Sequence, residues 1–303
     1  MLLAISAASA HAAFPGRNGP LAYYFPDPIA DLGYVEFVPI FGPVPSVFER
    51  WEEIDSPGTV SPGGRRLTIL DRWRGRWAIW VMRKTPWGGR ATLLAPPPRG
   101  REDGEEQWAP SGTSVVFVRQ TTEGRHRTIF TKRLDPRSRA RRLGRGWSPV
   151  WSSRGRIAYV AGGPGRETNI WTMRWDGSDR RQITSGGRDD GPEWSPDGAS
   201  IAFARVNGVR DPDNGIYAPP TDIHVVSAAG GAPRRLTDTP DHEQWPAYSP
   251  DGRWIAYGGY KGTITIVSST DPARVLRTIR CGYPIPTPED RYCGGLDWLP
   301  AVR

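Results

Sequence analysis

The sequence predicts an all-β fold, a six-bladed β-propeller of four-stranded antiparallel blades, and three observations lead to this prediction. A Trp-Ser-Pro-Asp-Gly unit recurs along the chain, its copies follow one another at intervals of 43 to 54 residues, and Gly and Pro separate short runs of β-branched and aromatic residues. A blade of four strands takes roughly 40 to 50 residues, which matches the interval. Helical solenoids share that period, but the apolar residues here do not follow helical spacing.

The recurring unit is clearest in two copies. One runs from Trp194 to Gly198 and is followed by Ile-Ala-Phe; the other runs from Tyr248 to Gly252 and is followed by Ile-Ala-Tyr. Three weaker copies begin at Val60, Trp108 and Trp151. We expect the aromatic residue to wedge between neighbouring blades, the Pro to restrict the backbone, and Asp-Gly to turn the chain into a second strand, because Gly accepts a positive φ.

The later strands of each copy follow the same order. Third strands are predicted at residues 169–173, 222–226 and 263–267, and each leads through a turn into a fourth strand. The fourth strands carry the pairs Arg141-Arg142, Arg180-Arg181 and Arg234-Arg235. Charged side chains on an outermost strand discourage edge-to-edge association, so most of the arginine surplus has a structural explanation.

The two ends of the repeat region predict one blade between them. Residues 295–300 look like an innermost strand without its partners, and residues 18–23 look like a second strand without its first. Pairing the two would complete a sixth blade and close the ring, which removes exposed sheet edges. Residues 26–58 are rich in Pro and are the least regular part of the pattern.

Taken together, these units resemble the TolB-like, WD-type propeller repeat, in which Pro-x-Trp-Ser-Pro-Asp-Gly, Ile-Ala-Phe and Arg-Arg-Leu-Thr segments recur. Residues 192–203 and 246–257 match it most closely, and the resemblance covers roughly residues 18–300. It implies a single propeller domain over residues 13–303. A resemblance of this kind implies a fold more than a function.

Residues 1–12 are interpreted as an export signal. A short apolar start leads into small residues that end in Ala10-His11-Ala12, an A-x-A cleavage pattern. The basic segment that usually begins such a signal is missing, so a start upstream of Met1 and a short frayed tail remain alternatives. No later stretch reaches the roughly 20 apolar residues of a membrane helix. We therefore expect a secreted monomer, periplasmic or extracellular, without a transmembrane segment.

Two cysteines, Cys281 and Cys293, lie near the C-terminus. In an oxidising compartment they are expected to form a disulfide, worth about 3 kcal/mol for a loop of this size. Two buried free thiols are the alternative, and a metal pair is disfavoured because no second Cys or His pair accompanies them.

The net charge of +8 does not by itself predict nucleic-acid binding. No long basic run or basic helix concentrates the charge, and a clustered basic footprint is what such binding requires. We therefore expect no nucleic-acid partner.

Signatures of catalysis are missing from the sequence. There is no Gly-x-Ser-x-Gly elbow, no His-Glu-x-x-His metal motif and no phosphate-binding glycine loop. His126 lies in an Arg-rich loop and His224 lies within a predicted strand. Residues 211–215 have the composition of a calcium loop but lack its other ligands, which favours a long polar hairpin loop. We expect no catalytic residue, no metal and no cofactor.

One set of residues suggests a binding site. The segments that enter the innermost strands carry acids at equivalent places of the repeat, which should converge at one mouth of a central channel and could hold a cation or a basic peptide. The predicted site residues are Glu105, Glu106, Asp189, Asp190, Asp241, His242 and Glu243. Solvated loop acids without a ligand are the alternative.

The leading functional hypothesis is a non-catalytic scaffold that binds a protein or peptide. The alternative is a carbohydrate-active enzyme, a polysaccharide lyase or glycosidase, with carbohydrate as its ligand. Trp73, Trp77, Trp80 and Trp87 could stack on sugars, and paired carboxylates could act as acid and base.

Overall fold

The computed structural model describes residues 18–27, 32–38, 57–62, 65–83, 91–162, 167–207, 220–259, 262–280 and 294–300. Within these ranges the chain is all-β and contains no helix. It follows that no helix in this part of the chain is long and apolar enough to cross a membrane.

Within the described residues, five sheets have four antiparallel strands each, and each takes consecutive strands of the chain. We call them blades 1 to 5. Blade 1 consists of β3 (Pro57–Val60), β4 (Arg66–Trp73), β5 (Arg76–Arg83) and β6 (Ala91–Leu93). Blade 2 consists of β7 (Arg101–Trp108), β8 (Ser114–Thr121), β9 (Thr128–Arg133) and β10 (Arg141–Arg145). Blade 3 consists of β11 (Trp147–Trp151), β12 (Arg156–Gly162), β13 (Thr168–Arg174) and β14 (Arg181–Gln182).

Blades 4 and 5 repeat this order. Blade 4 consists of β15 (Asp189–Trp194), β16 (Ser200–Val206), β17 (Thr221–Ser227) and β18 (Arg234–Arg235). Blade 5 consists of β19 (Glu243–Tyr248), β20 (Trp254–Gly259), β21 (Thr263–Ser268) and β22 (Val275–Arg280). The third and fourth strands therefore lie where the sequence pattern placed them.

A further sheet joins strands from the two ends of the chain. β1 (Asn18–Asp27) lies between β2 (Leu32–Val38) and β23 (Gly294–Pro300), with Leu21 opposite Trp298. β1 thus occupies the position of a second strand and β23 that of a first strand. We call these three strands the terminal sheet.

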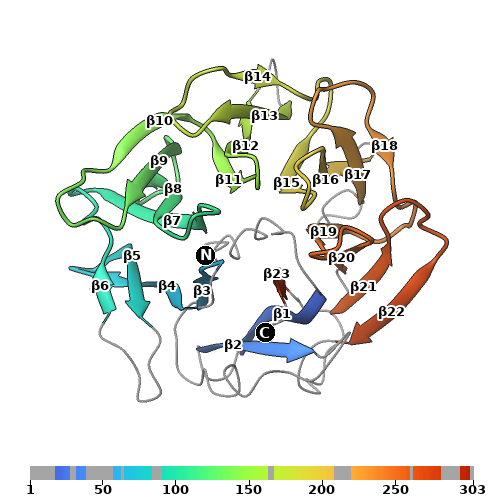
Figure 1. The fold of residues 1–303 in the computed structure, drawn as a ribbon, viewed down its shortest axis with the longest axis horizontal. Helices are drawn as coiled ribbons and strands as arrows, with labels where there is room; N and C mark the ends of the chain where they lie inside the picture. Colours follow the sequence, from blue (N-terminus) through green and yellow to red (C-terminus); the bar gives the residue numbers. More distant parts are fainter. Residues whose placement is uncertain are drawn as a thin grey trace.

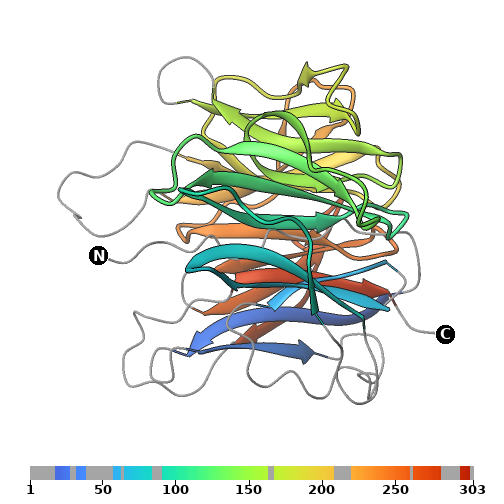
Figure 2. The same ribbon diagram turned by 90° about the vertical axis from the view of Figure 1, so that its left-hand side faces the viewer.

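The sheets follow one another around a common centre, as in a β-propeller (Figure 1). The first strand of each blade lies nearest the centre, and consecutive first strands contact each other from β3 to β23. Seen from the side, the strands run largely across the thin dimension of the molecule (Figure 2). The first strands therefore surround the centre of the ring.

The hydrophobic core lies between blades. Trp194 at the end of β15 is 1% exposed and packs with Val150 and Ile170 of blade 3 as well as Phe203 of its own blade. Trp108 is packed in the same way between blades 1 and 2. Burial of such large apolar side chains between two neighbouring sheets is a main source of stability for the stacked sheets.

The turn after each first strand explains the Ser-Pro-Asp-Gly sequence. The N–H of Gly198 donates to the carbonyl of Ser195 at 2.8 Å, and Gly198 takes a φ of +65°. The Asp197 carboxylate accepts from the Ser195 hydroxyl at 2.6 Å and from the N–H of Ala199 at 3.0 Å. Ser249 and Asp251 make the matching contacts in blade 5. The Gly is thus the last residue of the turn, after Pro and Asp.

Several predicted features lie outside the described residues. These are the export signal at residues 1–12, the Cys281–Cys293 disulfide, the polar loop at residues 211–215, and Trp87. They remain predictions.

Candidate functional site

A β-bulge recurs in the first strands of blades 2 to 5. The pairing of each strand with its neighbour shifts register just before the terminal aromatic residue. The bulged residues, each three positions before that aromatic residue, have φ between +46° and +56°: Glu105, Ser148, Gly191 and Trp245. A left-handed backbone conformation costs free energy for residues other than Gly. A bulge also changes the direction in which the side chains of its strand point. The first strands therefore hold strained residues beside the centre of the ring.

Two of these bulges help to join three blades. The N–H of Ser148 donates to Oε2 of Glu105 at 2.6 Å, and the Ser148 hydroxyl donates to Oδ1 of Asp190 at 3.3 Å. Glu105 comes from blade 2, Ser148 from blade 3 and Asp190 from blade 4. Arg127 lies on the other side of Glu105, with Nη1 3.9 Å from Oε1. We call Glu105, Ser148 and Asp190 the central cluster.

The carboxyl groups of the central cluster hold their protons more tightly than ordinary surface acids. Burial raises the pKa of Glu105, and the nearby charge of Asp190 adds to this effect, while Arg127 and the Ser148 N–H oppose it. Burial also raises the pKa of Asp190, against hydrogen bonds from Gly191 and Ser148. Asp190 is nevertheless exposed to solvent, so a ligand can reach its side chain.

Asp189 and Glu243, two other predicted site residues, are committed to contacts within the protein. Asp189 is 0% exposed; Arg205 binds it through two hydrogen bonds of 2.6 and 2.8 Å, and the Thr184 hydroxyl donates to it at 2.5 Å. Glu243 accepts from the hydroxyls of Thr237 and Thr239. Because Thr184 and Thr237 belong to the preceding blade, these acids tie consecutive blades together.

The remaining predicted residues lie in different surroundings. Glu106 is 3% exposed, and burial raises its pKa against a hydrogen bond from Thr68 of blade 1. Asp241 and His242 precede β19, and Nδ1 of His242 lies 3.2 Å from the Thr221 hydroxyl. Thr221 also donates to the carbonyl of Glu243, so His242 and Glu243 lie at the junction of blades 4 and 5.

The structure corrects the proposed equivalence of the acids. Asp189 lies five residues before Trp194, and the residue five before Trp108 is Asp103, not Glu105. Asp103 pairs with Arg119 as Asp189 pairs with Arg205, with hydrogen bonds of 2.6 and 2.7 Å. Most of the predicted acids also lie inside β7, β15 and β19 and not in the segments before them, because the first strands begin earlier than expected.

Asp103 itself was missed as a candidate. Burial raises the pKa of Asp103 to about 6 and outweighs the opposing effect of Arg119. The sequence did contain a signal, because both Asp103–Arg119 and Asp189–Arg205 are separated by 16 residues. Ser148 was also missed, since a lone serine in a bulge has no sequence signature.

Charge is separated between the inside and the outside of the ring. Among the described first strands, β7 carries four acidic residues, β15 three, and β19 and β23 one each, while Arg101 is the one basic residue. The fourth strands of the five blades show the reverse: they contain Arg in β10, β14, β18 and β22, and no acidic residue. A chain of net charge +8 therefore places acids in the strands that surround its centre.

No group of three or more His, Cys, Asp or Glu side chains in the described part of the chain is arranged to hold a metal ion. Two of the tryptophans considered for sugar stacking, Trp73 and Trp77, are partly covered by arginine. The guanidinium of Arg72 lies 4.0 Å from the ring centre of Trp77, and those of Arg74 and Arg76 lie 4.8 and 5.1 Å from that of Trp73.

Comparison with known sequences gives partial matches. No family model matches the chain. It is 28% identical over 154 residues to an uncharacterized protein of Agrobacterium fabrum, covering 50% of this chain and 45% of the relative. It is 32% identical over 106 residues to an uncharacterized peptidase of Bacillus subtilis, covering 33% of this chain and 15% of the relative. The chain thus matches less than half the length of either relative.

Comparison with solved structures shows the fold. TolB from Acinetobacter baumannii matches with a TM-score of 0.64 and 16% identity over 93% of this chain and 67% of that one. A putative TolB from Agrobacterium tumefaciens matches with a TM-score of 0.59 and 16% identity over 93% and 99%. A puromycin hydrolase matches with a TM-score of 0.56 and 19% identity over 90% and 47%. The fold is that of a TolB-like β-propeller, and identities this low show the fold alone.

Proposed function

We propose that this chain is an exported, non-catalytic binding scaffold that holds a basic segment of a partner protein at the centre of a six-bladed ring. In this proposal the terminal sheet is the sixth blade and closes the ring. The pairing of β1 with β23 and the position of β23 beside β19 support that role. A closed ring has no exposed first strand, which suits a rigid scaffold.

The separation of charge is the observation that carries the proposal. A protein of net charge +8 repels basic ligands in general, so a basic ligand would bind it only where acids are concentrated. The first strands provide that concentration at Glu105 and Asp190, whereas Asp103 and Asp189 of the same strands are already paired with arginines. An inserted Lys or Arg side chain would meet a region of opposite charge.

Asp190 is the residue best placed to contact such a ligand. It is exposed, whereas Asp189, Glu106 and Glu243 are almost fully buried. Glu105 lies beside it through Ser148, so a cationic group near Asp190 would be close to a second carboxylate. Contacts of this kind are charge-assisted and stronger than neutral hydrogen bonds.

Export to the periplasm or the cell exterior completes the proposal. The small-residue pattern at residues 1–12 supports it, as does the Cys281–Cys293 pair, which would be expected as a disulfide in such a compartment. Similarity to TolB structures adds support at the level of fold.

A catalytic role is the alternative, as a carbohydrate-active or other hydrolytic enzyme. The specific observation in its favour is a pair of carboxyl groups with raised pKa, Glu105 and Asp190, since a carboxylic acid with raised pKa can serve as a general acid. A structural neighbour is a puromycin hydrolase, but this chain covers 47% of that protein.

Affinity capture from the envelope fraction of the source organism tests the proposal. The full chain, Asp190→Asn and Glu123→Gln would serve as baits, with covalent cross-linking and mass spectrometry. Glu123 is a matched control, because it is an exposed acid in the β8–β9 hairpin, outside the central cluster. We expect cross-links from a Lys- or Arg-rich segment to β7 and β15, lost with Asp190→Asn and kept with Glu123→Gln. Cleavage of an oligosaccharide panel without any captured protein would favour the enzyme instead.

A further inference from the structure

A pocket of about 690 Å³ lies where blade 1 meets blade 2, and its lining includes no residue of the central cluster. One wall is the β4–β5 hairpin and the other is the loop between β6 and β7. Its lining consists of Trp73, Arg74, Arg76, Pro96, Pro97, Pro98, Arg99 and Gly100. The volume lies within the range of roughly 300 to 1,000 Å³ that is typical of small-molecule sites.

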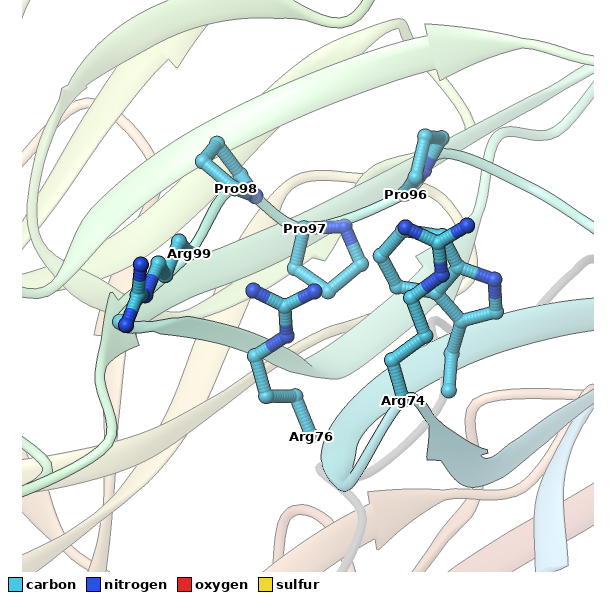
Figure 3. A pocket seen from close by; sticks show the side chains of 8 residues that line it. Arg74, Arg76, Pro96, Pro97, Pro98 and Arg99 are labelled. Atoms are coloured by element: carbon cyan, nitrogen blue, oxygen red, sulfur yellow. The ribbon is translucent and has the colours of Figure 1, made fainter.

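Three arginines give this pocket its charge. Figure 3 shows the guanidinium group of Arg76 below Pro97 and that of Arg74 below Pro96, with Arg99 beside Pro98. Within the described residues, no carboxylate forms an ion pair with any of the three. Nε of Arg76 is buried and has no hydrogen-bond acceptor among those residues. The pocket therefore concentrates positive charge that the described part of the protein does not neutralise.

Cation–π contacts with Trp73 restrain two of these guanidinium groups. Those of Arg74 and Arg76 both lie over the ring of Trp73. A cation–π contact with the ring leaves N–H groups of a guanidinium available to bind an anion. The two arginines thus lose less side-chain entropy when a ligand binds than freely rotating ones would.

The backbone of both walls is also restrained. Arg74 and Gly75 form the tip of the hairpin with φ of +51° and +77°, as a tight two-residue turn requires. In the other wall, the N–H of Arg101 donates to the carbonyl of Pro98 at 3.0 Å, and Gly100 takes a φ of +74°. The three consecutive prolines fix φ along the rest of the loop. Arg99 is therefore presented from a turn and not from a loose segment.

We propose that this pocket binds a small ligand carrying two or more anionic groups, either phosphates or carboxylates. Guanidinium groups bind both through paired N–H donors, and three of them exceed what a single anionic group needs. The prolines offer an apolar surface to the rest of the ligand. This site is separate from the proposed basic-segment site and has the opposite charge.

Calorimetric titration of the full chain with pyrophosphate and with citrate tests this proposal. The variants are Arg99→Gln and Arg76→Gln, with Arg125→Gln as the matched control. Arg125 is an exposed arginine in the β8–β9 hairpin. This hairpin contacts the pocket loop, since the N–H of Thr122 donates to the carbonyl of Gly100 at 3.4 Å. Circular dichroism and thermal melting would establish that each variant is folded.

We expect saturable binding of at least one probe, weakened about tenfold or more by Arg99→Gln and by Arg76→Gln and unchanged by Arg125→Gln. Binding of pyrophosphate alone would identify a phosphate ligand, and binding of citrate alone a carboxylate ligand. Failure of both probes to bind, or equal weakening by Arg125→Gln, would overturn the proposal. Arg99→Gln is the decisive variant, because Arg99 is exposed on a turn, where a substitution that removes the charge has little effect on stability.

Discussion

Asp189 and Arg205 form a two-hydrogen-bond ion pair across the first two strands of blade 4, with distances of 2.6 and 2.8 Å. The carboxylate is completely buried, and the Arg205 side chain is 18% exposed. Removing one member of a buried pair leaves the other charge without compensation. We predict that Asp189→Asn lowers the free energy of unfolding by about 3 kcal/mol in urea titrations. A loss no larger than that of Glu123→Gln, a substitution at an exposed acid, would contradict a structural role for Asp189.

Thr184 joins blade 3 to this pair. Its hydroxyl accepts from the N–H of Ile170 at 2.8 Å and donates to Asp189 at 2.5 Å. Thr184→Val would leave both groups short of a partner, and we expect a loss of about 2 kcal/mol of unfolding free energy. Thr184→Ser keeps the hydroxyl and should retain most of the unfolding free energy that Thr184→Val loses. Equal losses for the two variants would show that side-chain packing, and not the hydroxyl, matters here.

Two buried tryptophans allow a matched comparison. The indole N–H of Trp194 donates to the carbonyl of Val150 in the preceding blade at 3.2 Å, whereas that of Trp151 has no acceptor among the described residues. Both side chains are at most 5% exposed. Replacement by Phe removes similar volume at both sites, so Trp194→Phe should cost about 1 kcal/mol more than Trp151→Phe. Thermal and urea unfolding would measure the difference, and the opposite order would argue against the inter-blade hydrogen bond.

Asp103 predicts a pH dependence of stability. Burial raises its pKa from 3.8 to about 6, so the folded chain holds this proton more tightly than the unfolded chain does. Ionisation of Asp103 therefore lowers the free energy of unfolding as pH rises from about 4 to about 6, and the cost is complete above that window. Asp103→Asn lacks this contribution. In urea titrations from about pH 4 to 7, the wild type should lose stability relative to Asp103→Asn, and a relative gain would contradict the raised pKa.

The strands and turns of the blades could be predicted because their causes are local. Ser195, Asp197 and Gly198 make their contacts within one turn, and Trp194 has the size and position expected of a wedge between blades. The repeated sequence therefore predicted where strands begin and turn, although some first strands begin earlier than expected.

The candidate site was harder to predict because its geometry depends on the bulges. Glu105, Ser148 and Trp245 have positive φ without being Gly, so nothing in their sequence marks a left-handed residue. The bulges and the neighbouring blades decide which acids meet. Asp189 and Asp190 look alike in the sequence, yet one is buried against Arg205 and the other reaches solvent beside Ser148.

The most direct test of the central claim is a fluorescence-anisotropy titration of the full chain with a labelled hexalysine peptide at neutral pH and low salt. A protein of net charge +8 should bind this peptide only through a local acidic site. We predict saturable binding that is weakened about tenfold by Asp190→Asn, unchanged by Glu123→Gln, and progressively lost as acidification protonates Glu105 and Asp190. No saturable binding, or equal weakening by the two substitutions, would contradict a basic-segment site at the centre of the ring.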